Sequence, residues 1–137
     1  MMKNFEYYRS LPEGMAAEAV ERELEEFLQI QADMNVFQFM EALDELADRQ
    51  WHTYSLLSES LKFRLEDLVI SRWQDQPEVT NYALSIVSRL GLVRAWCFLV
   101  ALDRKVISAA SREAIQDAET EMSSTISDPY SGMVKNR

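Results

Sequence analysis

The chain has 137 residues, of which 14 are Lys or Arg and 23 are Asp or Glu, so its net charge is −9. This length suits one domain that folds without disulfides or a structural metal, and 47% hydrophobic residues argue against a disordered chain. Only three Gly and three Pro argue against an all-β fold, and the acidity argues against nucleic-acid binding.

Helix-start signals and apolar periodicity predict two helices in the first part of the chain. The segment 10–13, Ser-Leu-Pro-Glu, is typical of a capping box with Pro in the first turn. Apolar residues then recur with a period of about 3.6, which predicts a helix over residues 11–32. Asn35 and Gln38 form a second box, followed by a predicted helix over residues 36–50.

The next predicted helix begins near residue 53 or 58, ends near Trp73, and has two apolar sides. Its main apolar line includes Leu61 and Leu65, whereas Phe63 and Ile70 lie on the opposite side. A helix that is apolar on two sides is either enclosed in the core or offers one side to a partner.

Two more helices follow Asp75, which we expect to cap the first of them, with Pro77 in its first turn. Gly91 is placed where a helix C-cap belongs. The segment 92–102 is apolar nearly all round, so we expect it to form a central helix that the others cover, with Cys97 buried and inert.

A last helix is predicted to begin near Ser108 and to end near residue 122. Residues 123–137 are rich in Ser and lack periodicity, so we expect a flexible C-terminal tail. The predicted fold is all-α: a compact single-domain bundle of about six helices over residues 1–122, with the central apolar helix near 92–102. No internal repeat is evident, and a solenoid of helical hairpins would contain only three pairs.

The single cysteine excludes an intramolecular disulfide and indicates a reducing compartment. The N-terminus lacks the apolar core of a signal peptide. The longest apolar stretch, residues 86–102, is too short and too charged to span a bilayer. We therefore expect a cytoplasmic protein without a membrane association.

The sequence offers little catalytic equipment, and we expect neither an enzyme nor a cofactor. A di-iron bundle needs Glu-x-x-His on two helices, but the chain has a single histidine, His52, without a Glu three residues earlier. Asp48 and His52 could share a helix face, and a metal site there would need Glu45 or Asp44 as well. A small hydrolase centred on Asp48 and His52 is kept as an alternative.

The negative charge is concentrated near the N-terminus. The first 50 residues contain four basic and twelve acidic residues, a net of −8, whereas the rest of the chain has a net of −1. On the predicted helix over 11–32, one arc contains Glu18, Glu21 and Glu25. On the predicted helix over 36–50, one arc contains Glu41, Asp44, Glu45 and Asp48, and Trp51 and Tyr54 follow.

Solvated helix faces usually mix charges of both signs, because Glu and Lys four residues apart attract one another. The helix over 36–50 has no Lys, so its acids repel one another. Acids that tolerate repulsion beside large aromatic residues are typical of a surface that binds a basic partner. A face that only keeps the protein soluble is the alternative interpretation.

The leading hypothesis is therefore a protein-binding module, most concretely an inhibitor or immunity-type protein that neutralises a basic toxin or nuclease. We expect steering by Glu41, Asp44, Glu45 and Asp48 and anchoring by Trp51 and Tyr54, with Glu18, Glu21 and Glu25 as second choice. The alternative is a homodimer or adaptor that pairs through Phe63, Ile70 and Trp73. A transcription factor is disfavoured, since no compact basic recognition helix is present. The sequence leaves the oligomeric state open.

Overall fold

The computed structural model describes residues 4–122 and contains seven α-helices and one 3₁₀ turn within that range. The helices are α1 (Phe5–Arg9), α2 (Ala17–Ile30), α3 (Val36–Trp51), α4 (Glu59–Arg72), α5 (Pro77–Leu90), α6 (Val93–Val100) and α7 (Ala109–Met122), and the turn η1 (Gln31–Asp33) follows α2. The predicted all-α fold is confirmed. The tail predicted over residues 123–137 lies outside the described residues.

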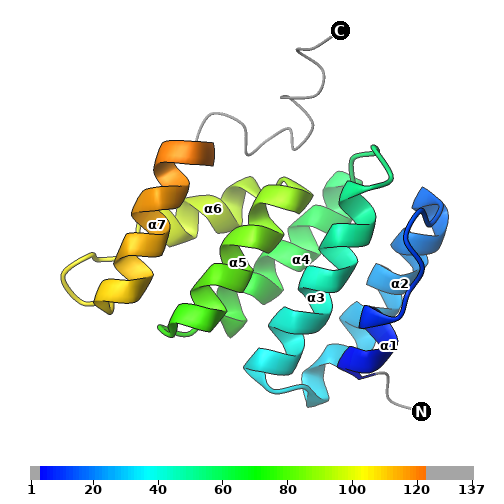
Figure 1. The fold of residues 1–137 in the computed structure, drawn as a ribbon, viewed down its shortest axis with the longest axis horizontal. Coiled ribbons are helices and arrows are strands. Elements are labelled where there is room, and N and C mark those ends of the chain that lie inside the picture. Colours follow the sequence, from blue (N-terminus) through cyan, green and yellow to red (C-terminus); the bar gives the residue numbers. More distant parts are fainter. Residues whose placement is uncertain (1–3, 123–137) are drawn as a thin grey trace, which may run out of the picture.

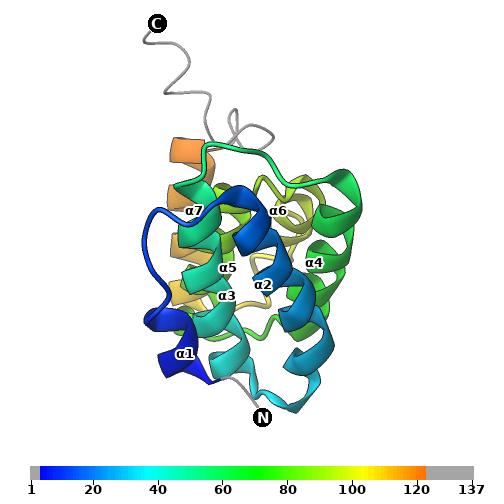
Figure 2. The same ribbon diagram turned by 90° about the vertical axis from the view of Figure 1, so that its right-hand side faces the viewer.

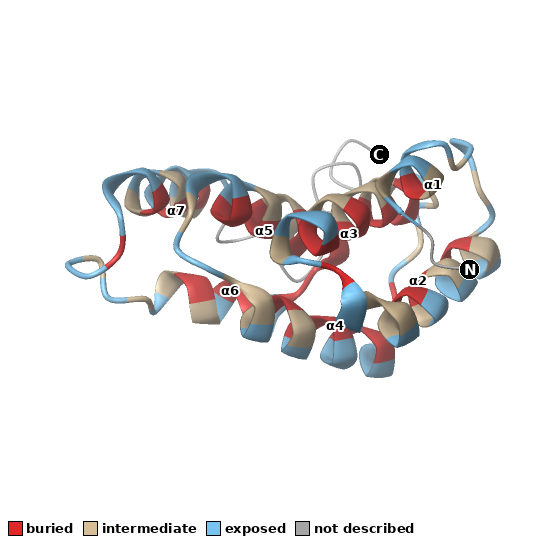
Figure 3. Cartoon of the chain, turned by 90° about the horizontal axis from the view of Figure 1, so that it is seen from below, coloured by how far each residue is buried: buried red, intermediate tan, exposed pale blue. Residues whose placement is uncertain are grey.

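The helices form two layers. Helices α1, α3, α5 and α7 lie side by side in one layer, and α2, α4 and α6 lie in the other (Figure 1, Figure 3). Each of the consecutive pairs α2–α3, α4–α5 and α6–α7 therefore contributes one helix to each layer. Contacts between neighbouring pairs bury a continuous core, with the most extensive contact between α3 and α5. This arrangement resembles a short stack of helical hairpins.

Local capping explains where most helices begin and end. Asn35 and Gln38 form the expected capping box at α3, with the Asn35 side chain 2.9 Å from the Gln38 backbone nitrogen. Ser58 caps α4, and Ser108 Oγ accepts a hydrogen bond from the Ser111 backbone at the start of α7. Gly91 ends α5 in the left-handed conformation (φ 69°), as predicted.

The N-terminal prediction is wrong, because the segment 10–13 does not start a helix. Instead, Ser10 is the C-cap of α1, and α2 begins only at Ala17. Gly14 has φ +75°, a left-handed conformation that a continuous α-helix cannot contain. Helix α1 packs against α3 (Figure 2). Its fully buried Tyr8 also makes an edge-to-face contact with Phe27 of α2.

The prediction of a central helix over 92–102 is also wrong. Helix α6 lies at one end of the second layer (Figure 3) and buries only Ala95, Trp96 and Leu99. Cys97, which was expected to be buried, is exposed. In a two-layer stack, the helix at the end of a layer has a neighbouring helix on one side only. An apolar sequence on all sides therefore does not by itself place a helix at the centre. The most buried helices are α3 and α5.

Helix α6 has no capping side chain of its own, and a carboxylate from another helix supplies one. Glu66 of α4 is 6% exposed, and its Oε2 accepts a hydrogen bond of 2.6 Å from the Arg94 backbone nitrogen in the first turn of α6. A carboxylate is favoured there by the unpaired amides and the dipole of the helix. This contact joins residues 28 positions apart and fixes α6 against α4.

The capping box of α3 predicts a measurable loss of stability. Replacing Asn35 with Ala removes the side-chain acceptor for the Gln38 amide and should lower the free energy of unfolding by about 1 kcal/mol. Urea unfolding of the full chain measures this change. Asn81→Ala, at an exposed interior position of α5, is the matched control and should be neutral or slightly stabilising. Equal losses in both variants would contradict the role of the cap.

Candidate functional site

Four carboxylates of α3 lie along its boundary with α5, and we call Glu41, Asp44, Glu45 and Asp48 the α3 acidic surface. All four residues are partly exposed. The Asp44 carboxylate accepts a hydrogen bond of 2.8 Å from Ser85 Oγ of α5. Because α3 and α5 share the largest helix contact of the fold, this surface is supported by a rigid part of the core (Figure 1).

Two arginines partly neutralise this surface. Arg49 has a side chain only 8% exposed and forms ion pairs with Glu45 at 2.7 Å and Asp48 at 3.1 Å. Its Nη2 also donates to the carbonyls of Arg9 and Leu11, so it ties α3 to the segment after α1. From α5, Arg89 approaches Asp44 at 3.8 Å and Asp48 at 3.7 Å.

Contrary to the prediction from the sequence, the acids of α3 are not simply mutually repelling. Three of the four have a cationic partner within 4 Å, and one partner comes from another helix. Among residues 4–122, Glu41 is the member of the surface for which no ion pair is found.

The carboxylates of this surface repel one another and a neighbouring tyrosine, although burial is the larger effect on the pKa of both groups that show a shift. Burial raises the pKa of Asp44, and repulsion by Glu45 and Asp48 adds to this, against the opposing effects of Ser85 and Arg89. Burial also raises the pKa of the Tyr82 hydroxyl on α5, with repulsion from Glu41, Asp44 and Glu45. A cation placed beside Asp44 and Tyr82 would offset the repulsion between these groups and the other carboxylates.

The predicted aromatic anchors lie at the C-terminal end of α3. The Trp51 ring is 5.2 Å from the His52 ring and 6.4 Å from that of Tyr54. Tyr54 is 65% exposed and has φ 57°, a left-handed conformation that costs a non-glycine residue roughly 1–3 kcal/mol. Leu56, 54% exposed, extends this apolar end, and sequence periodicity could not identify it because it lies in a loop.

The second-choice acids belong to a different surface. Glu18, Glu21 and Glu25 lie on α2, in the other layer, where they line a broad hollow together with Arg22 and Gln29. Glu25 forms an ion pair with Arg64 of α4. The two groups of acids therefore do not form one continuous binding face.

The apolar line considered for a homodimer is only partly exposed. Phe63 is 54% exposed, and its ring stacks on the Arg94 guanidinium at 4.0 Å. Ile70 and Trp73 instead pack against the core, and the Trp73 ring contacts Phe98. Phe63 is thus isolated from the other two.

The Asp48–His52 pair shows hydrogen bonding within α3. His52 Nδ1 lies 2.8 Å from the Asp48 backbone carbonyl, to which it donates, and 3.6 Å from the Asp48 carboxylate. Within the described part of the chain, no group of three or more His, Cys, Asp and Glu residues is arranged to hold a metal ion.

Comparisons of the chain with protein families, with curated proteins and with solved structures found no match. None of the helices between residues 4 and 122 combines the length and the apolar character needed to cross a membrane.

The contact between Asp44 and Ser85 predicts a shift in titration. Ser85→Ala removes a donor that stabilises the Asp44 carboxylate, so it should raise the pKa of Asp44 further above the ordinary value of 3.8. NMR titration of the side-chain carboxyl carbon measures this. Ser88→Ala is the matched control, because Ser88 Oγ donates to the Ser85 carbonyl.

The sign of the linked effect on stability follows from the raised pKa. The protonated form of Asp44 is favoured in the folded state. The contribution of Asp44 to stability is therefore present below its pKa in the unfolded chain and is lost as pH rises through its pKa in the folded protein. Ser85→Ala should therefore extend that loss to higher pH. An unchanged or lower pKa in Ser85→Ala, or an equal shift in Ser88→Ala, would refute this description of the surface.

Proposed function

We propose that the protein is an interaction module that binds a basic protein through the α3 acidic surface. In its most concrete form, the protein is a cytoplasmic inhibitor or immunity-type protein that neutralises a cationic toxin or nuclease. The surface carboxylates attract the partner, and the aromatic end of α3 holds it. The α2 hollow, lined by Glu18, Glu21 and Glu25, is the second candidate surface.

The observation that carries the proposal is that the α3 acidic surface and the aromatic residues Trp51 and Tyr54 lie along α3 and at its C-terminal end. Burial, with a smaller contribution from repulsion by the α3 carboxylates, raises the pKa values of Asp44 and Tyr82, and the exposed ring of Tyr54 lies just beyond the same helix. Complementary potentials accelerate encounter, whereas exposed aromatic side chains supply the area that slows dissociation. A surface that serves solubility alone does not need a strained, exposed tyrosine beside it.

Arg89 has a specific place in this proposal. Its guanidinium lies 3.7–3.8 Å from Asp44 and Asp48 and is 37% exposed, so these ion pairs are longer and more solvated than those of Arg49. A Lys or Arg of the partner competes for the same carboxylates. Arg89 therefore weakens the attraction between the partner and the α3 acidic surface but leaves the carboxylates accessible. Its removal should strengthen that attraction.

The association rate provides the first test. The full chain is used to capture a partner from its source organism, and association of the purified partner is then measured at low and physiological salt. The rate constant should fall by roughly tenfold or more as salt rises, because steering is screened. Glu41→Lys should lower the rate and Arg89→Gln should raise it, whereas Glu113→Lys, an equal charge change on exposed α7, should have little effect.

The dissociation rate tests the anchors separately. Tyr54→Gly removes the ring at a backbone conformation that glycine adopts without strain, so the fold should be kept. Dissociation should accelerate by about tenfold or more if Tyr54 is an anchor. A salt-independent association rate, or equal rates for Glu41→Lys and wild type, would exclude the α3 acidic surface as the binding site. A captured nuclease whose activity persists in the complex would exclude the inhibitor form of the proposal.

A further inference from the structure

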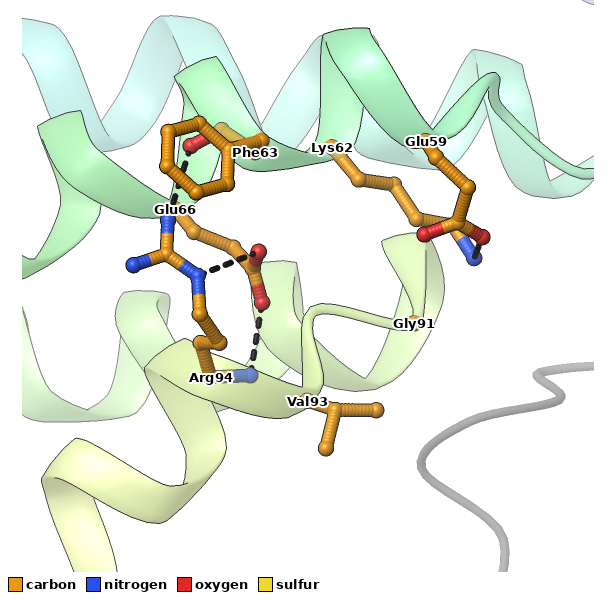
Figure 4. Close-up of a pocket in the computed structure, with 7 residues that line it drawn as sticks. All are labelled: Glu59, Lys62, Phe63, Glu66, Gly91, Val93 and Arg94. Carbon is orange, nitrogen blue, oxygen red and sulfur yellow. Dashed lines mark hydrogen bonds and ion pairs between the residues drawn. The ribbon is translucent and has the colours of Figure 1, made fainter.

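A pocket of about 360 Å³ lies between α4 and α6, in the other layer from the α3 acidic surface. We call it the Lys62 pocket. Its lining from α4 consists of Glu59, Lys62, Phe63 and Glu66, and α6 contributes Val93 and Arg94 (Figure 4). The volume is at the lower end of the range that is usual for small-molecule sites.

One wall of the pocket is fixed by hydrogen bonds. Arg94 Nε donates to Glu66 at 3.2 Å, and Arg94 Nη2 donates to the Phe63 carbonyl at 3.1 Å and to Asp67 at 2.9 Å. Together with the cap that Glu66 provides for α6, these bonds hold Glu66 and Arg94 in one arrangement (Figure 4). The charge of Arg94 is therefore already matched by two carboxylates.

Lys62 differs from Arg94, because its ammonium has few partners. The side chain is only 10% exposed, and its closest carboxylate oxygen, on Glu59, is 3.8 Å from Nζ. That distance is too long for a hydrogen bond, and the Glu59 side chain is 93% exposed. An ammonium group has three donors, and Lys62 Nζ is not among the buried side-chain atoms of residues 4–122 that lack a partner, so its donors stay open to solvent in the pocket. The position near Gly91, at the C-terminal end of α5, favours a cation but supplies no hydrogen bond that the structure shows (Figure 4).

Apolar side chains line other parts of the same pocket, whereas the Lys62 side chain extends toward Glu59 (Figure 4). Phe63 is 54% exposed and Val93 is 42% exposed, and both line the pocket. Phe63 is held by its stacking on Arg94, and Val93 is the first residue of α6. The pocket thus combines a cation whose ion pair with Glu59 is long with two exposed apolar side chains.

We propose that the Lys62 pocket binds a monocarboxylate that carries a short apolar group. Lys62 Nζ donates to the carboxylate, and Phe63 and Val93 contact the apolar group. A dianion such as phosphate is disfavoured, because Glu59 and Glu66 also line the pocket and would repel the second charge. The C-terminal residue of a peptide and a small free acid share this chemistry.

NMR titration of the full chain with N-acetyl-valine tests the proposal. This probe has one carboxylate and one short apolar side chain, and it should cause saturable shifts of the backbone amides around residues 59–66 and 91–94. N-acetyl-valinamide has the same apolar group without the charge, and inorganic phosphate has the charge without the apolar group. Both should bind at least about tenfold more weakly than N-acetyl-valine. A short peptide ending in Val separates the two sources. If the peptide binds more tightly than N-acetyl-valine, the ligand is a protein C-terminus. If the two bind equally, the ligand is a small acid.

Three variants assign the binding to Lys62. Lys62→Met keeps the aliphatic chain but removes the donors, and should weaken binding of N-acetyl-valine by roughly tenfold or more. Val93→Glu places a like charge at an exposed position and should abolish binding without harming the fold. Val106→Glu, in the exposed loop before α7, is its matched control and should bind normally. Glu59→Gln removes the carboxylate that competes for Lys62 and should bind several-fold more tightly.

The outcomes that would overturn the proposal are distinct. Shifts that do not saturate, or that are equal for N-acetyl-valine and its amide, show that Lys62 does not recognise a carboxylate. Phosphate binding as tight as that of N-acetyl-valine contradicts the predicted ligand class. Unchanged binding in Val93→Glu, which does not depend on how Lys62→Met folds, shows that the ligand binds elsewhere.

Discussion

The packing of α3 against α5 is the contact on which the rest of the structure depends. These two helices carry the most buried side chains of the fold, and α1, α2, α6 and α7 each pack on one of them, whereas α4 packs on α6 and α2. Burial of this apolar surface is the main source of stability. The same contact brings Ser85 and Arg89 of α5 to the carboxylates of α3, so the core determines the electrostatics of the candidate surface.

Local signals in the sequence predict most of the helices. Capping residues and apolar periodicity act within about one helical turn, so Asn35, Ser58 and Gly91 are sufficient to place the ends of three helices. The errors arise where distant residues decide. Helix α1 is separate from α2 and packs back on it through the contact of Tyr8 with Phe27, and α6 is positioned by Glu66, which lies 28 residues before the amide it caps.

The candidate sites follow the same rule. Periodicity places Glu41, Asp44, Glu45 and Asp48 on one side of α3, as the structure has them, because that arrangement depends only on helix geometry. The number of these charges that are neutralised depends on Arg89 of α5, and no spacing within α3 contains that information. The Lys62 pocket was not predictable for the same reason, since its lining comes from two helices whose contact is a property of the tertiary fold.

The two proposed sites depend differently on the protein's net charge of −9. A basic partner approaches from a distance and responds to the summed field of the acids, which salt weakens beyond a Debye length of about 8 Å. A small carboxylate in the Lys62 pocket is repelled by that same field until it reaches the ammonium of Lys62, where the interaction is short-ranged. Physiological salt therefore weakens the attraction of a basic partner to the α3 acidic surface. It also weakens the repulsion between the protein's net charge and an anion that approaches the Lys62 pocket. An anion site in so acidic a protein is consistent with electrostatics, because the Lys62 ammonium acts at short range and lies in the layer opposite the α3 acidic surface.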